Sequence, residues 1–323
     1  MLIDEKLEEK SFTDLLLEYS NRFKLPFPLL YMNGVSNEII KQRILECFER
    51  NEIYDLGKQL QDKHSLKKDL NYKNIINKII SSMVDINYDY KLLLLEQLKP
   101  IYERKEGKSF TFKEHLESLI ITMLNNQRWG DNTIKENMPR IREIFRDFDY
   151  EYLKNANPED LYLRLKSINC SNLALFKQLK GLENNIKTLE KIEKIYGSLD
   201  EFVTSDDPYV IANTLYSGKY KLEQIGLSFA LEYLRKVGIN TCKIDSQIKR
   251  LFGSQRLGFS RGENSTRLQA MCIIKNMAKE CNLTEIEVES ILWQFCLHRC
   301  ANICSELPNC CKCKLKDICN YIS

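Results

Sequence analysis

The sequence predicts an all-α protein. Only 12 Gly and 7 Pro are found among its 323 residues, so few turn signals punctuate the chain. Apolar residues recur at helical spacing in most long segments, as at Ile40, Ile44 and Phe48 after the cap candidates Ser36 and Asn37. Alternating runs of β-branched residues bounded by turn signals are almost absent, so we expect little or no sheet.

The composition is that of an ordinary globular protein, with 43% apolar and 29% charged residues. No segment approaches the roughly twenty apolar residues of a membrane span. The N-terminus turns acidic at Asp4 and Glu5, unlike a secretory signal, so we expect a soluble, cytoplasmic protein with no membrane partner. The net charge of +3 leaves nucleic-acid binding undecided, because such binding needs local rather than overall positive charge.

A domain boundary is expected near residue 108. The segment 98–113 contains Pro100, Gly107 and many charged residues, which is typical of a connection between domains. The chain would then consist of an N-terminal helical region of unknown role, 1–108, and a C-terminal domain, 109–323. No motif that carries chemistry is found in the first region.

Five of the 12 cysteines crowd into the C-terminal loop, which favours a metal site over disulfides. Four of them follow the spacing C-x5-C-x2-C-x5-C, at Cys304, Cys310, Cys313 and Cys319. A zinc site usually separates two cysteine pairs by about a dozen residues or more, whereas a [4Fe–4S] cluster accepts one short loop. The spacing therefore predicts a [4Fe–4S] cluster held by residues 304–319, with zinc or metal-free buried thiols as the alternatives.

Cys310 and Cys311 are adjacent, so their side chains diverge and only one of them is expected to be a ligand. Cys310 is preferred because the two-residue gap to Cys313 lets the backbone turn beneath the metal, and Cys311 is its alternate. Cys296 and Cys300 lie at helical i, i+4 spacing and are expected to be core residues of the preceding helix.

This terminal loop resembles that of the helix-hairpin-helix DNA glycosylases of the endonuclease III superfamily. In that family a C-x6-C-x2-C-x5-C loop follows an apolar and aromatic helix, and here Ile291-Leu292-Trp293 precedes the cysteines. The first gap is one residue shorter in this chain. The resemblance covers Ser109 to Ile322 and implies a helical barrel in the middle, flanked in sequence by segments that form the cluster domain, with DNA held in the cleft between them.

The segment Leu222–Ala230 stands where the family has its Leu-Pro-Gly-Val-Gly hairpin, whose backbone N–H groups bind DNA phosphate. Gly226 matches the second glycine, and Gln224 replaces the first. The resemblance implies DNA contacts at Gln224, Ile225 and Gly226. Without it, the segment reads as an ordinary junction between two helices.

Asp245 matches the catalytic aspartate of the family and follows Gly226 by 19 residues. Cleavage of an N-glycosidic bond builds positive charge on the deoxyribose, and a carboxylate beneath the sugar stabilises that charge and helps position the nucleophile. The alternative role for Asp245 is that of an N-cap for the helix beginning at Ser246. Lys249 on that helix is expected to contact DNA.

Bifunctional members of the family carry a lysine in the helix after the hairpin, and its amine forms a Schiff base with the sugar. Ser228 stands at that position here, and a hydroxyl group forms no Schiff base. This predicts a monofunctional glycosylase that uses water. A nearby lysine such as Lys221 would instead give a bifunctional enzyme.

Residues 116–129 resemble the early helix of the family, which ends in a Leu-x-x-Gln segment. In relatives the glutamine fills the gap left by the flipped nucleotide and recovers part of the unstacking energy. The resemblance implies this role for Gln127, and a polar residue at a helix end is the alternative.

Together these features predict an enzyme that flips a modified base out of double-stranded DNA and hydrolyses its N-glycosidic bond, with Asp245 as the key carboxylate. No residue selects the base. The alternatives are a bifunctional glycosylase and lyase, and a catalytically silent iron–sulfur protein that only binds DNA. A monomer is the expectation from the family.

Overall fold

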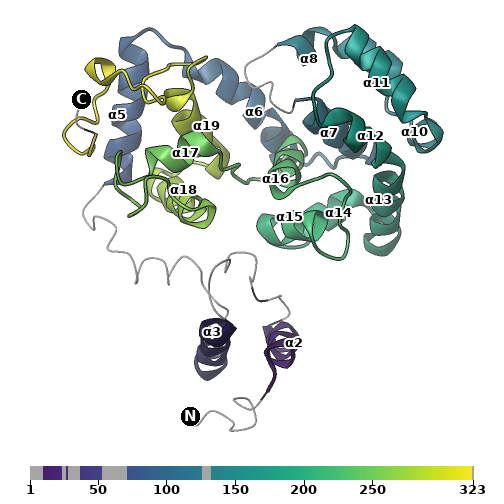
Figure 1. Cartoon of the computed structure of the whole chain (residues 1–323), viewed down its shortest axis with the longest axis horizontal. Coiled ribbons are helices and arrows are strands. Elements are labelled where there is room, and N and C mark those ends of the chain that lie inside the picture. Colours follow the sequence, from purple (N-terminus) through teal and green to yellow (C-terminus); the bar gives the residue numbers. More distant parts are fainter. Residues whose placement is uncertain (1–9, 24–26, 28–36, 53–70, 126–131, 322–323) are drawn as a thin grey trace. The chain divides into compact units, whose positions relative to one another are not determined.

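The computed structural model describes residues 10–23, 27, 37–52, 71–125 and 132–321 (Figure 1). Every regular element within these residues is a helix, which confirms the predicted all-α class. The chain divides into two compact units, Met1–Lys68 and Asp69–Ser323, and each has an apolar core of its own.

The smaller unit packs α2 (Phe12–Phe23) against α3 (Asn37–Arg50). The apolar spacing noted in the sequence is that of a buried stripe, because Ile40, Ile44 and Phe48 all lie in the core on α3. The ring of Phe48 stacks on that of Phe23 in α2, with a centroid separation of 6.0 Å.

The larger unit contains all the motifs singled out above. Its helices are, in chain order, α5 (Tyr72–Asp85), α6 (Tyr90–Lys105), α7 (Phe112–Leu124), α8 (Thr133–Glu136), α9 (Met138–Ile144), α10 (Tyr150–Asn155), α11 (Pro158–Ser167), α12 (Leu175–Lys180), α13 (Leu182–Tyr196), α14 (Leu199–Thr204), α15 (Pro208–Tyr216), α16 (Leu227–Lys236), α17 (Ser246–Leu251), α18 (Arg267–Cys281), α19 (Glu285–Cys296) and the short 3-10 helix η2 (Cys310–Lys312).

The boundary between the units follows Lys68, not residue 108 as the sequence suggested. Both α5 and α6 belong to the larger unit, since each packs against α19. Pro100, which suggested a connection, lies inside α6, and the chain turns only after Lys105. A proline removes one intrahelical hydrogen bond, and burial of its neighbour Ile101 against α19 offsets that loss.

Helices α7 to α16 form the helical lobe, which has one continuous core. Helix α7 contacts α12, α14 and α16 within this lobe. A capping box between Thr111 and Glu114 fixes its first turn, and Leu116, Leu119 and Ile120 are fully buried on it.

Helices α5 and α17 to α19, with the C-terminal cysteine loop, form the terminal lobe. Helix α19 contacts α5, α6, α17 and α18, and most of its side chains are buried. Helix α6 contacts both α16 and α19, so it joins the two lobes (Figure 1). Segments that flank the helical lobe in sequence thus come together, in the order that the resemblance implied.

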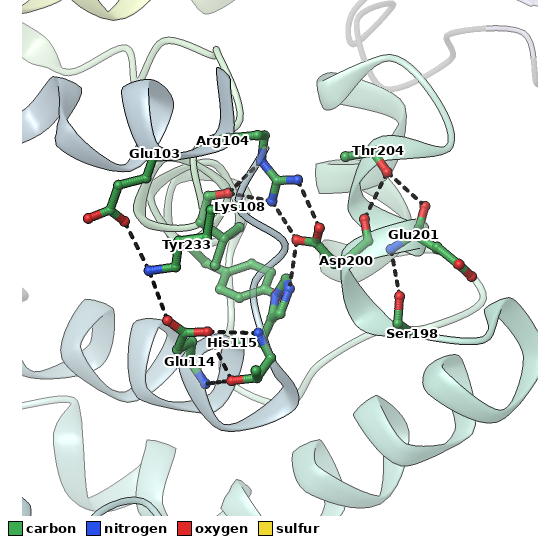
Figure 2. A network of polar contacts seen from close by, with 12 residues as sticks. Glu103, Arg104, Lys108, Glu114, His115, Ser198, Asp200, Glu201, Thr204 and Tyr233 are labelled. Carbon is green, nitrogen blue, oxygen red and sulfur yellow. Dashed lines mark hydrogen bonds and ion pairs between the residues drawn. The ribbon is translucent and has the colours of Figure 1, made fainter. Parts of the chain in front are cut away.

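A buried polar network fixes α6 to the helical lobe (Figure 2). Arg104 on α6 donates through Nη1 to Oδ2 of Asp200 on α14 at 3.0 Å, and through Nε to the Val237 carbonyl at 3.0 Å. His115 on α7 is buried between Asp200, 3.4 Å from its Nε2, and the hydroxyl of Tyr233 on α16, 2.6 Å from its Nδ1. Four helices are therefore tied together at the end of α16.

The same region includes a close backbone approach. Gly238 has a φ of +76°, and a Cβ built there would lie 2.4 Å from the Pro100 carbonyl oxygen of α6. Only glycine fits this position, so the chain leaves α16 with its path fixed against α6. That path leads directly to Asp245.

Candidate active site

The predicted hairpin joins α15 to α16, which pack closely against each other. Gln224 at its tip has a φ of +56°, in the left-handed region where glycine is the usual residue. The turn therefore keeps a glycine-like backbone although its first glycine is replaced, at a cost of about 1 kcal/mol.

Buried amides of the helical lobe hold this tip in place. Asn185 of α13 donates through Nδ2 to the Glu223 carbonyl at 3.1 Å and accepts through Oδ1 from the Glu223 N–H at 2.6 Å. Gln178 of α12 donates to the Gln224 carbonyl at 3.4 Å. Because Asn185 and Gln178 are both buried, the strained tip is held by groups that cannot exchange their partners for water.

Gly226 precedes the first turn of α16 in an extended conformation, and no side chain caps that end. A Cβ built at Gly226 would meet nothing within 4 Å, so packing does not require glycine there. The uncapped N–H groups are open to an approaching anion. The side chain of Ile225 is buried in the core, so this residue offers a ligand only its backbone.

Asp245 is the N-cap of α17 and accepts a hydrogen bond from the Ile248 N–H at 3.0 Å. The local interpretation of the sequence, as a helix cap, is thus correct. The side chain is half-buried, and the Trp293 indole of α19 hydrogen-bonds to it. The Asp245 carboxylate therefore accepts hydrogen bonds from both α17 and α19.

Burial raises the pKa of Asp245 above that of an ordinary aspartate. The N–H groups of Ile248 and Gln247, the charge of Lys243 and the indole of Trp293 act in the opposite direction. The carboxylate is held in place by donors and kept partly out of water, the condition in which it interacts strongly with a developing positive charge.

A group of buried and half-buried charged side chains interacts electrostatically with Asp245 or with one another. Arg235 of α16 donates through Nη1 to Oε2 of Glu289 on α19 at 2.8 Å, and the same nitrogen lies 3.8 Å from Oε2 of Glu232. Burial raises the pKa of Glu289 to about 7, and Asp245 and Glu232 act in the same direction. Lys243, two residues before Asp245, interacts electrostatically with all of these groups.

The sequence did not reveal this charged group, and it marked Trp293 only as part of the apolar and aromatic helix before the cysteines. Its members come from α16, the loop before α17, and α19, and only folding brings them together. One signal was present in the sequence: α16 is amphipathic yet carries Glu232 and Arg235 at positions that the fold buries.

Ser228, for which the sequence suggested the position of a lyase lysine, lies half-buried in the first turn of α16, with its Oγ 3.5 Å from Nη2 of Arg267 on α18. Lys221 is exposed before the hairpin tip. Lys249 lies half-buried on α17, and its carbonyl accepts from the Ser265 N–H at 2.9 Å. The DNA contact predicted for Lys249 stays a prediction.

Gln127 lies outside the described residues, so its predicted role is untested. The loop between α11 and α12 offers a candidate that sequence reasoning missed. Leu173, between α11 and α12, is 92% exposed, and its neighbour Asn172 donates to the Met123 carbonyl at 2.9 Å at the end of α7. An exposed apolar side chain close to the end of α7 is suited to insert between bases.

The four cysteines of the predicted spacing all lie in the loop that follows α19. The thiol of Cys313 interacts electrostatically with those of Cys304, Cys310 and Cys319. Cys311 is exposed and donates to Oδ1 of Asn309 at 2.8 Å. Cys296 lies buried at the end of α19, whereas Cys300 follows that helix and is half-buried, so only Cys296 is the core helix residue that was expected. The choice of Cys310 over Cys311 as a ligand stays a prediction.

In the described part of the chain, no three side chains of metal-binding type are grouped closely enough for one metal ion. Two arginines lie beside Cys304. Arg250 donates to the Cys304 carbonyl at 3.4 Å, and the charges of Arg250 and Arg256 both act on the Cys304 thiol. Among the described residues, the Nε atoms of both arginines are buried without a hydrogen-bond partner, which suits an adjacent anionic group.

The sequence matches no family model and no curated protein. Among solved structures, it is similar to the crystal structure of Methanocaldococcus jannaschii 8-oxoguanine glycosylase/lyase in complex with 15mer DNA containing 8-oxoguanine. The identity is 20%, the match covers 68% of this chain and 95% of that chain, and the TM-score is 0.44. At this level the likeness establishes neither fold family nor activity. Among the described helices, none is long and apolar enough to cross a membrane.

Proposed function

We propose that this protein is a DNA N-glycosylase that releases a modified base from double-stranded DNA. The observation that carries the proposal is Asp245, a half-buried carboxylate fixed by the first turn of α17 and by the Trp293 indole. It follows a helix-hairpin-helix element whose second helix has an uncapped N-terminus.

The hairpin binds the DNA backbone in this proposal. The N–H groups at Gly226 and in the first turn of α16 donate to a phosphate, and the absence of a side chain at Gly226 lets the DNA backbone approach. Phosphate contact orients the duplex without reading its sequence, so the hairpin fixes register and not base choice.

Asp245 acts on the sugar of the extruded nucleotide. As the bond to the base breaks, positive charge develops on the deoxyribose, and the ionised carboxylate stabilises it while orienting a water molecule for attack. The N–H groups of α17 and the Trp293 indole donate to the carboxylate and fix its orientation. Asp245 supplies charge and orientation without forming a covalent bond.

A [4Fe–4S] cluster bound by Cys304, Cys310, Cys313 and Cys319 would complete the terminal lobe. Such a cluster supplies a rigid cross-link between distant parts of the loop and, where its potential allows, an electron-transfer centre. The unpaired donors of Arg250 and Arg256 support this ligand set. The protein acts as a monomer in this proposal.

The test is base release from duplexes that each carry one modified base, with iron content recorded for each preparation. Asp245→Asn keeps an N-cap side chain, so α17 is retained while the charge is lost. We expect release to fall by about a hundredfold or more in this variant. Asp149→Asn is the matched control, because Asp149 caps α10 through the Tyr152 N–H in the same way, and release should be unchanged.

Tight DNA binding with no base release from any duplex would contradict the proposal and indicate a binding protein instead. Equal release by the wild type and Asp245→Asn would also contradict it, because the carboxylate would then have no part in the reaction.

A further inference from the structure

Two features fix Arg267, the first residue of α18, beside α17. A capping box that begins at Thr266 orders the first turn of α18. The Ser265 N–H donates to the Lys249 carbonyl of α17 at 2.9 Å, and the Lys249 N–H donates to the Asp245 carbonyl at 3.2 Å. The start of α18 therefore lies against the helix that Asp245 caps.

The guanidinium of Arg267 reaches from the terminal lobe to the helical lobe. Its Nη2 donates to the Ser228 hydroxyl at 3.5 Å, in the first turn of α16. That turn follows Gly226, and no side chain caps it. Because a serine hydroxyl both accepts and donates, Ser228 can accept from Arg267 and still donate to an oxygen atom of a ligand. The two side chains therefore form one polar pair between α16 and α18.

Arg267 is half-buried, and within the part of the chain that the structure describes no carboxylate forms an ion pair with it. Arg235 shows the contrast, since it also connects α16 with the terminal lobe. Its Nη1 lies 2.8 Å from Oε2 of Glu289 and 3.8 Å from Oε2 of Glu232. A cation that is partly removed from water without an anion is destabilising. The position of Arg267 therefore favours a ligand that supplies negative charge.

The position of Arg267 is also unfavourable for α18 itself. The N-terminal end of a helix carries partial positive charge, so acidic side chains stabilise the first turn and basic side chains destabilise it. Arg267 is the first residue of this 15-residue helix, whose first turn has no acidic residue. The first turn of α16 has none either. Positive charge is thus concentrated around Ser228 at a cost in stability, as is typical of a site that binds an anion.

We propose that Arg267 and the Ser228 hydroxyl bind a phosphate of the DNA backbone next to the extruded nucleotide. A guanidinium donates two parallel hydrogen bonds to a phosphate, so arginine is favoured where such planar recognition is needed. The inference rests on the proposed base-excision function and deepens it by naming a substrate contact. It also accounts for the serine, because a lysine in place of Ser228 would put a second cation beside Arg267.

This contact would position the reacting sugar. Arg267 follows the segment that is hydrogen-bonded to α17, and Asp245 caps that helix. A phosphate bound by Arg267 is covalently joined to the deoxyribose, so its binding limits where the sugar can lie relative to the Asp245 carboxylate. Restricting a reacting group in this way lowers the entropic part of the activation barrier. Loss of Arg267 should therefore weaken DNA binding and slow base release.

The test uses the full-length protein and a duplex with a central tetrahydrofuran residue, a stable analogue of an abasic nucleotide. In a series of these duplexes, one backbone phosphate at a time is replaced by an uncharged methylphosphonate. We expect the wild type to lose about tenfold in affinity at one linkage next to the analogue. Arg267→Gln should bind the unmodified duplex about tenfold more weakly and lose nothing further at that linkage. Its affinity should also fall less steeply with salt, by about one phosphate contact.

Arg164→Gln is the matched control, because Arg164 is a half-buried arginine of α11, 3.9 Å from Asp160, and its loss should leave DNA binding unchanged. Arg267→Gln removes a cation from the positive end of α18, so urea unfolding should show no loss of stability. If Arg267→Gln fails to fold, Arg267→Lys takes its place in the scan. It keeps the charge without the paired donors, and it should lose less affinity than the wild type at the same linkage.

Equal losses for the wild type and the Arg267 variant at every linkage overturn the inference. Normal DNA binding by a destabilised Arg267→Gln also overturns it, because the arginine would then have only a structural role. Base release without coupling between Arg267 and one phosphate would leave the proposed glycosylase standing and remove only the phosphate contact. Coupling with no base release from any modified duplex would do the reverse, because the protein would then bind DNA without excising bases.

Discussion

Asp200 provides the sharpest test of how the two lobes are joined. It is nearly buried, and it accepts from the guanidinium of Arg104, which also binds the Val237 carbonyl at the end of α16 (Figure 2). Asp200→Asn keeps the shape and one acceptor, but it removes the charge and turns an N–H group toward the guanidinium. Arg104 would remain as a largely buried cation without its anion.

Breaking a buried ion pair from one side costs about 3–5 kcal/mol. Asparagine still accepts one hydrogen bond from Arg104, so the lower end of that range, about 3 kcal/mol, is expected at neutral pH. Glu201→Gln is the matched control, because Glu201 lies next in α14 but is exposed, and it should change stability by less than about 0.5 kcal/mol. Urea unfolding of the full chain, followed by circular dichroism, measures both.

The pH dependence supplies an internal check. Burial raises the pKa of Asp200, but the contacts with His115 and Arg104 outweigh it and hold the pKa well below its ordinary value. A lowered folded-state pKa contributes stability that is present above the unfolded value of about 3.9 and is lost as the pH falls below it. The difference in the free energy of unfolding between wild type and Asp200→Asn should therefore become smaller below about pH 4. If Asp200→Asn is as stable as Glu201→Gln at pH 7, this reasoning is refuted. The attraction between Arg104 and Asp200 would then do no more than offset the free energy of removing both charges from water.

Four further outcomes are expected. Asn185→Ala leaves the backbone N–H and carbonyl at the hairpin tip without partners, so unfolding measurements should show a loss of about 2 kcal/mol, with weaker binding in a DNA titration. The rate of base release should fall as the pH drops through the pKa of Asp245, and because burial raises that pKa, a rate profile should place the fall above about pH 3.9. Cys310→Ser should lose iron on metal analysis, whereas Cys311→Ser should keep it, because the Cys311 thiol binds a neighbouring side chain. Leu173→Ala should slow base release but change the free energy of unfolding by less than about 0.5 kcal/mol, given that the side chain is exposed.

Sequence patterns predicted what depends on near neighbours. The apolar period of α3 requires only residues within one helix, and the N-cap role of Asp245 requires only the three residues that follow it. The choice between Cys310 and Cys311 follows from two adjacent side chains diverging. The first two expectations agree with the described geometry, and the choice between the two cysteines stays a prediction.

What depends on packing between distant segments could not be predicted in this way. Trp293 contacts Asp245 from α19, a helix that begins 40 residues after Asp245, and no local sequence pattern at either residue predicts the contact. The boundary was misplaced for a related reason. Pro100 is a turn signal locally, and only the burial of α6 against α19 and α16 allows the helix to continue through it.

Gln224 shows how such packing changes the interpretation of a motif. Gln224 replaces the first glycine of the hairpin, yet its backbone takes the left-handed conformation that a glycine would take. The strain is held by Asn185 and Gln178, whose buried amides bond to the carbonyl and N–H groups of the tip. The motif therefore persists as a backbone shape, not as a pair of glycines.

The same logic explains why the charges beside Asp245 are buried at all. Glu232, Arg235, Glu289 and Lys243 would each be more stable in water, and Oε2 of Glu232 has no hydrogen-bond partner among the described residues. A fold selected for stability alone would place apolar side chains between α16 and α19. Charges kept at that cost, around the Asp245 carboxylate, are better explained by the chemistry of the site than by the stability of the fold.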